Sequence, residues 1–176
     1  MASRPGKRQI DIRVFPAFES LVKIAWVRNV AEIALVTADP ASGAGASVVI
    51  ADDETLTDLN WRFRGLDEVT DVLSFGEISA DPDKLSTGES PVPIFPPTPD
   101  DSLTLGEVVL SYPLALRQAG EHNVTAEEEL ALLIVHGILH LNGHDHANPD
   151  EEAAMKALEE AALNLFFADS TSRRMN

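Results

Sequence analysis

The fold of this chain is decided by residues 125–146, TAEEELALLIVHGILHLNGHDH. Thr125 is followed three residues later by Glu128, a capping-box arrangement that predicts the start of a helix. The apolar run 130–141 is nearly continuous, so we expect this helix to be buried through the middle of the domain. Gly143 tolerates a positive φ and predicts the end of the helix.

The same stretch contains most of the histidines, since all five in the chain lie between positions 122 and 146. His136 and His140 are four residues apart and therefore project from one helix face. A turn after the helix can bring His146 toward the same ion. Neutral imidazole is the commonest zinc ligand, and three protein ligands leave a fourth position for water. The spacing predicts an open, catalytic metal site at the C-terminal end of the buried helix.

The histidine spacing also matches the metzincin protease signature, with one large exception. That signature has Glu directly after the first His, where it acts as the general base. This chain has Gly137, which cannot take a proton. Zinc lowers the pKa of its bound water to ~7, so the metal-bound water remains a nucleophile without that base. A phosphodiester clamped by the metal and an arginine suits such a site.

Composition indicates one globular domain. The chain has 176 residues, of which 44% are hydrophobic, and no apolar run is long enough to span a bilayer. The basic N-terminus lacks the apolar segment of a signal peptide, which argues against secretion. Cysteine is absent, so any transition metal must be held by nitrogen and oxygen ligands. The lack of disulfides is compatible with a cytosolic protein.

The net charge of −16 is concentrated in one part of the chain. Residues 65–155 contain 18 Asp and Glu but only two basic residues, Lys84 and Arg117. Nucleic-acid binders usually carry a basic patch, which this part lacks. The charge therefore argues against avid, nonspecific binding to RNA or DNA. It leaves open a weak or assisted encounter with a nucleic-acid substrate.

Patterning along the chain predicts a single α+β domain, 1–176, with a small mixed sheet of about four strands and about five helices. Alternating or β-rich segments predict strands at 8–15, 46–50, 69–75 and 105–112. Helical spacing and caps predict helices at 17–37, from Asp52 or Asp53 to about 61, and at 113–120, 125–141 and 149–167. The Pro-rich segment 80–102 is expected to be an exposed, poorly ordered insertion, and 1–7 and 170–176 are expected to be frayed.

A second dense segment combines LNWRFRGLD at 59–67 with TDVLSF at 70–75. Arg64 precedes a glycine at a helix-to-loop transition, where a guanidinium can be presented to an oxyanion. The alternative is an ordinary salt bridge to Asp67 or Asp71. Trp61 and Phe63 could stack on a base, although core packing is expected for at least one of them.

Three motifs in this order resemble the YbeY family of bacterial rRNA-maturation endoribonucleases. They are LNxxFRGxDxxTDVLSF, LGEVVLS and HGILHLNGHDH, which together extend over about Val48 to His146. The resemblance implies one zinc ion held by His136, His140 and His146, with Arg64 as the functionally important arginine. It also implies single-strand-specific RNA cleavage, 16S rRNA 3′-end maturation and ribosome quality control in the cytoplasm. The implied partner is the small ribosomal subunit with its proteins, and neither a membrane nor DNA is expected.

Two positions depart from the family pattern. The family usually has an aromatic residue where this chain has His144, and Asp where it has Glu107. His144 follows His140 by four residues and could compete as a ligand if the helix continued, but the turn glycine favours a bystander or second-shell role. Asp145 has two interpretations of similar weight: it orients a ligand imidazole or caps the turn through backbone N–H groups. His122 is expected to be a polar loop residue.

Two rival functions remain open at this point. One is a metal hydrolase acting on another substrate, such as an amide. The other is a ribosome-assembly factor in which zinc is mainly structural and partner binding is the function. The acidic half of the chain favours these rivals somewhat, because an acidic surface can dock on basic ribosomal proteins and let the ribosome position the RNA.

Overall fold

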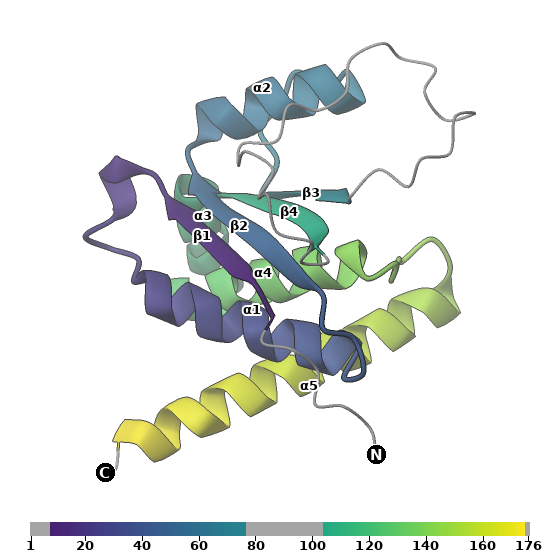
Figure 1. The fold of residues 1–176 in the computed structure, drawn as a ribbon. Coiled ribbons are helices and arrows are strands. Elements are labelled where there is room, and N and C mark those ends of the chain that lie inside the picture. Colours follow the sequence, from purple (N-terminus) through teal and green to yellow (C-terminus); the bar gives the residue numbers. More distant parts are fainter. Residues whose placement is uncertain (1–7, 77–103, 175–176) are drawn as a thin grey trace.

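The computed structural model describes residues 8–76 and 104–174, which form a four-stranded sheet and five α-helices (Figure 1). The strands are β1 (Ile10–Val14), β2 (Gly45–Ala51), β3 (Val72–Gly76) and β4 (Thr104–Ser111). The helices are α1 (Ile24–Ala38), α2 (Asp53–Arg64), α3 (Tyr112–His122), α4 (Ala126–Leu141) and α5 (Pro149–Arg174). A 3-10 helix, η1, occupies Pro16–Phe18. The predicted α+β architecture is confirmed.

The sheet is mixed, with strand order β1-β2-β4-β3. β1, β2 and β4 are parallel, and β3 runs antiparallel to β4 at one edge. Residues of β3 are paired directly with β4, from Val72 opposite Leu110 to Gly76 opposite Gly106. The edge strand therefore brings the LNxxFRGxDxxTDVLSF motif alongside the LGEVVLS motif.

The two faces of the sheet carry separate apolar clusters, because successive strand residues point to opposite sides. Val48 and Ile50 of β2 belong to the larger core, together with residues of α1, α4 and α5. Val49 and Ala51 of the same strand face the smaller cluster that also contains Leu56 of α2. Figure 1 shows the result: α2 covers one face, α1 and α4 lie against the other, and α5 packs outside them.

The central helix α4 begins as its sequence predicts. The Thr125 hydroxyl accepts from the Glu128 backbone N–H at 3.2 Å, and the Glu128 carboxylate accepts from the Thr125 N–H at 2.8 Å. This reciprocal pair satisfies two otherwise unbonded donors at the helix start. Beyond the first turn the helix is almost wholly buried, at Glu129, Leu130, Ala131, Leu133, Ile134, Val135, Gly137, Ile138 and Leu139.

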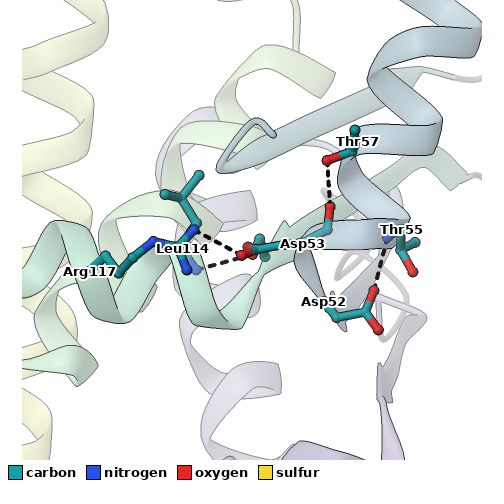
Figure 2. Close-up of polar contacts among 7 residues, drawn as sticks. Asp52, Asp53, Thr55, Thr57, Leu114 and Arg117 are labelled. Atoms are coloured by element: carbon teal, nitrogen blue, oxygen red, sulfur yellow. Dashed lines mark hydrogen bonds and ion pairs between the residues drawn. The ribbon is translucent and has the colours of Figure 1, made fainter. Parts of the chain in front are cut away.

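The start of α2 resolves the choice between two adjacent acids (Figure 2). The Asp52 carboxylate caps the helix by accepting from the Thr55 N–H at 2.9 Å, and these bonds to Thr55 lower the pKa of Asp52. Asp53 instead forms an ion pair with Arg117 of α3 at 2.9 Å. Asp53 also accepts a hydrogen bond from the Ser111 hydroxyl. Asp52 therefore caps the start of α2, and Asp53 connects α2 to α3.

The helix expected over 17–37 begins later, at Ile24. Pro16 starts η1, and the chain bends before α1. Phe18 packs against Tyr112 with ring centroids 5.0 Å apart, and Val22 is buried. Leu21, which the helical pattern placed on the apolar face, is 62% exposed. Tertiary packing of this segment against the start of α3 overrides its helical periodicity.

Two other helix ends differ from the predictions. α2 continues to Arg64 rather than to about Trp61 and ends where Gly65 adopts a φ of 70°. α5 continues to Arg174 rather than Phe167, so 170–174 are helical where fraying was expected. The predictions for 1–7, 80–102 and 175–176 fall outside the described residues. Among the described helices, none is long and apolar enough to cross a membrane.

Candidate metal centre

The end of α4 reverses the chain through a Schellman turn. Gly143 adopts a φ of 85°, its N–H donates to the His140 carbonyl at 3.0 Å, and the His144 N–H donates to the Leu139 carbonyl at 3.1 Å. These bonds satisfy carbonyls that the helix end would leave without partners. The Asp145 carboxylate then accepts from the His146 N–H at 2.8 Å. The turn returns His146 toward the helix face that carries the other two histidines.

His136, His140 and His146 form a group that could hold a metal ion, with one ligand atom from each residue and all three atoms within 4.8 Å of one another. Nε2 of His136 and Nε2 of His140 are 3.0 Å apart. Zn–N bonds of 2.0–2.1 Å in a tetrahedral site place ligand atoms about 3.4 Å apart. The helical pair is therefore already at ligand spacing.

The three side chains also have suitable chemistry. Burial lowers the pKa of His140, and the neighbouring His136 and His146 lower it further, against smaller effects of a His144 backbone hydrogen bond and Asp145. A depressed imidazole pKa favours the neutral form, whose lone pair binds metals. The first two histidines are partly buried on a rigid helix and the third is exposed in the turn. A set of three nitrogen ligands is typical of a catalytic zinc site, in which water takes the fourth position.

A fourth side chain contacts this group from another element. Oε1 of Glu159, on α5, lies 2.6 Å from Nδ1 of His136. Both side chains are partly buried. The nitrogen on the other side of the same ring faces His140. The His136 imidazole is therefore held between a carboxylate and the centre of the histidine group.

Gly137 packs against the sheet. A Cβ added there would lie 2.5 Å from Cγ1 of Val108 and 3.2 Å from Oγ of Ser74. The Ser74 hydroxyl also donates to the Gly137 carbonyl at 2.9 Å. In metzincins this position carries the general base. In this fold it is instead the place where α4 lies close to β3 and β4. A side chain at this position would require the side chains of Val108 and Ser74 to move.

Gly137→Ala is accordingly expected to destabilise the protein. Overpacking costs about 1–3 kcal/mol, and alanine recovers up to about 1 kcal/mol of helix propensity, so the net loss is about 0–2 kcal/mol against the wild type and about 1–3 kcal/mol against a helical Gly-to-Ala change that meets no clash. Urea unfolding followed by circular dichroism measures it. Gly120→Ala is the matched control, because a Cβ there meets nothing within 4 Å. Equal stability of the two variants would contradict the proposed close contact.

The LNxxFRGxDxxTDVLSF motif forms the C-terminal part of α2, the loop that follows and β3. Asn60 is buried, and its amide donates to the Glu68 carbonyl at 2.9 Å, which fixes the loop. Phe63 packs edge-on against Phe75 of β3, with ring centroids 5.0 Å apart. Arg64 is exposed. The motif's apolar and amide residues therefore hold the loop and β3 together while the guanidinium faces outward.

Arg64 has no ion-pair or hydrogen-bond partner among the residues that the structure describes. The salt bridge to Asp71 considered above is not formed, since Asp71 accepts from the Val72 N–H at 2.8 Å and from Gln118 at 3.1 Å. Within the described part of the chain, intermediate contacts connect the Arg64 segment to the three-histidine group, and they run through Phe63, β3 and the Ser74–Gly137 bond. No hydrogen bond or ion pair joins Arg64 to a histidine among the residues that the structure describes.

Comparison with known proteins identifies the family. A family model described as "Endoribonuclease YbeY" matches residues 17–166. The chain belongs to the YbeY endoribonuclease family. Endoribonuclease YbeY of Dehalococcoides mccartyi (strain ATCC BAA-2266 / KCTC 15142 / 195) is 40% identical over 157 residues, or 88% of each chain. Endoribonuclease YbeY of Roseiflexus sp. (strain RS-1) is 38% identical over 159 residues, which are 90% of this chain and 92% of that one.

A solved structure supports the fold. The solution structure of TM1509 from Thermotoga maritima matches with a TM-score of 0.57 and 24% identity, covering 94% of this chain and 93% of that chain. The α+β arrangement of this YbeY-family chain therefore has a solved counterpart.

The remaining candidates of this YbeY-family chain occupy distinct positions. His144 is not part of the three-histidine group, although its backbone belongs to the turn. Asp145 contacts the His146 N–H, the turn-capping arrangement. His122 lies in the last turn of α3 rather than in a loop and pairs with Glu129 at 3.0 Å, which raises the pKa of His122. Trp61 is 58% exposed, so of the two aromatic residues considered only Phe63 is packed on another described ring.

Proposed function

We propose that this YbeY-family protein is a zinc-dependent, single-strand-specific endoribonuclease that matures the 3′ end of 16S rRNA and takes part in ribosome quality control in the cytoplasm. One observation carries the proposal: the ligand atoms of His136, His140 and His146 converge within 4.8 Å at the end of a buried helix in a member of this family. We assign zinc to these three histidines. Residues 1–176 would act as one metallohydrolase domain, with 80–102 as an insertion.

The donor set supports zinc as the ion. All three candidate ligands are imidazoles, and the chain contains no cysteine. When bound, zinc would lower the pKa of a coordinated water to ~7 and polarise a phosphoryl oxygen. The chain's own contribution is to hold three imidazoles at fixed spacing, two on α4 and one in the turn that Gly143 permits.

Arg64 is the proposed phosphate contact. Its guanidinium is exposed and unpaired within the described part of the chain, so it is available to an incoming anion. A planar guanidinium can donate two parallel hydrogen bonds to phosphate oxygens and stabilise negative charge that develops on them. Gly137 offers no proton acceptor, so we expect no carboxylate base at the position used by metzincins.

The acidic charge supports small-subunit proteins as partners alongside rRNA. Residues 65–155 carry 18 acidic and two basic residues, a balance that repels free RNA and attracts basic proteins. Ribosomal proteins would then bring the RNA to the metal centre. The same charge favours a second candidate function, that of an assembly factor with a structural zinc, which would bind the subunit without cutting RNA.

A strand-scission assay on metal-quantified protein separates these functions. The zinc-loaded protein is expected to cut a single-stranded fragment of the 16S 3′ region and to leave the same sequence intact in a duplex. A chelator should abolish cutting, and stoichiometric zinc should restore it. Subunit binding with no zinc-dependent scission would favour the assembly factor and refute the nuclease.

A further inference from the structure

Glu159 has an unusual place on its helix. Met155, Ala162 and Phe166 are almost fully buried and follow one another at spacings that define the inward face of α5. Glu159 lies four residues after Met155 and three before Ala162, within this apolar stripe. A carboxylate at a core-facing position is costly unless it is hydrogen-bonded. Its partner is therefore expected to matter, and that partner is His136.

The contact indicates which ring nitrogen carries the proton. A carboxylate accepts hydrogen bonds, so Nδ1 of His136, 2.6 Å from Oε1 of Glu159, is the donor. In the neutral ring a proton on Nδ1 leaves the lone pair on Nε2. Nε2 is the atom that faces His140 at 3.0 Å. Glu159 thus presents the His136 lone pair to the centre of the group.

The other acids near the centre do not have this arrangement. The Asp145 carboxylate accepts from the His146 backbone N–H. Glu160, next to Glu159 on α5, is exposed. Of these three acids, only Glu159 has a carboxylate hydrogen-bonded to a ring nitrogen of the three histidines.

We propose that Glu159 is a positioning residue of the metal centre, which fixes the tautomer and orientation of His136 and thereby raises zinc affinity. The proposal rests on the metal site of the proposed function but not on the RNA substrate. Carboxylate partners of metal-bound histidines hold the ring and increase its basicity, and their removal typically lowers metal affinity about 10- to 100-fold. The contact also makes the metal centre depend on the docking of α5, which begins beyond the turn.

Zinc affinity is the first measurement, by competition with a chromogenic chelator on the full chain. Glu159→Ala is expected to bind zinc about 10- to 100-fold more weakly than the wild type. Glu159→Gln, which keeps an acceptor oxygen and loses the charge, should fall between them. Glu160→Gln is the control and should bind as the wild type does. Helical content by circular dichroism shows whether α5 remains folded.

The tautomer of His136 is the second measurement, read from ¹⁵N chemical shifts in the metal-free protein. The wild type is expected to carry the proton on Nδ1, and Glu159→Ala to move it toward Nε2. Wild-type zinc affinity in a folded Glu159→Ala, or an unchanged tautomer, would overturn the proposal. Neither assay contains RNA, so a protein that binds zinc through Glu159-dependent His136 but cuts no RNA would refute only the nuclease function.

Discussion

His140→Ala is expected to abolish RNA cleavage and zinc binding together. His140 is the middle residue of the group, with its Nε2 3.0 Å from Nε2 of His136 and its ring 5.2 Å from that of His146. Its removal leaves only two of the three candidate ligands, His136 and His146. Removal of only the hydrogen-bond partner of a zinc ligand lowers metal affinity or activity about 10- to 100-fold. Removal of a ligand itself should therefore lower zinc affinity and cleavage by more than about 100-fold. Zinc content by atomic emission and strand scission measure the two effects.

His144→Ala is the matched control for this experiment. Its ring lies in the same turn and outside the three-histidine group. The variant should retain one zinc per chain and cut RNA at the wild-type rate. If His144→Ala lost zinc and His140→Ala kept it, the ligand assignment would be wrong, and the alternative ligand four residues after His140 would replace it.

The central helix and its end could be predicted because their signals are local. The Thr125–Glu128 box, the apolar run and the turn glycine each act within a few residues, and each was confirmed. The same locality makes the convergence of the three histidines predictable: two share a helix face, and a short turn returns the third.

Contacts between distant segments could not be predicted in the same way. The sequence shows only that Gly137 lacks the general base that metzincins have at this position. In the structure, Gly137 allows α4 to lie close to Val108 and Ser74. Glu159 is 23 residues from His136 and looks like any acid on an amphipathic helix. The one available signal was its position within the buried stripe of Met155, Ala162 and Phe166, where an acid requires a partner.

The predicted helix over 17–37 was wrong at its start for a related reason. Helical spacing from Leu21 onward is a local signal, but Phe18 is held against Tyr112 and the bend before Ile24 follows from that packing. By contrast, the cap of α2 depends only on nearby residues, since Asp52 accepts from Thr55 three positions later. The sequence therefore limited the capping residue to Asp52 or Asp53. Periodicity over a long segment therefore predicts the existence of a helix more reliably than the residues at which the helix begins and ends.

Arg64→Ala is expected to slow cleavage about 100- to 1,000-fold and to leave the zinc content unchanged. This is the range observed when one hydrogen-bond donor to the charge that develops in a transition state is removed. Arg64 is not one of the group that could hold the metal, and it has no partner among the described residues whose loss would unfold the chain. The defect should therefore appear in kcat and KM and not in zinc content or in urea unfolding. Arg64→Lys should recover only part of the rate, because an ammonium cannot make the bidentate contact.

Arg62→Ala provides the matched control for Arg64→Ala. Arg62 is an exposed arginine on the same helix turn, but its guanidinium is already paired with Asp58 at 3.5 Å. A general loss of positive charge would affect both variants alike, since each removes one charge from the end of α2. A specific phosphate contact predicts a large defect for Arg64 and a small one for Arg62. Full cleavage by a zinc-loaded Arg64→Ala would show that this arginine does not act on the phosphate, and the family resemblance at this position would then reflect the loop structure held by Asn60 and Phe63.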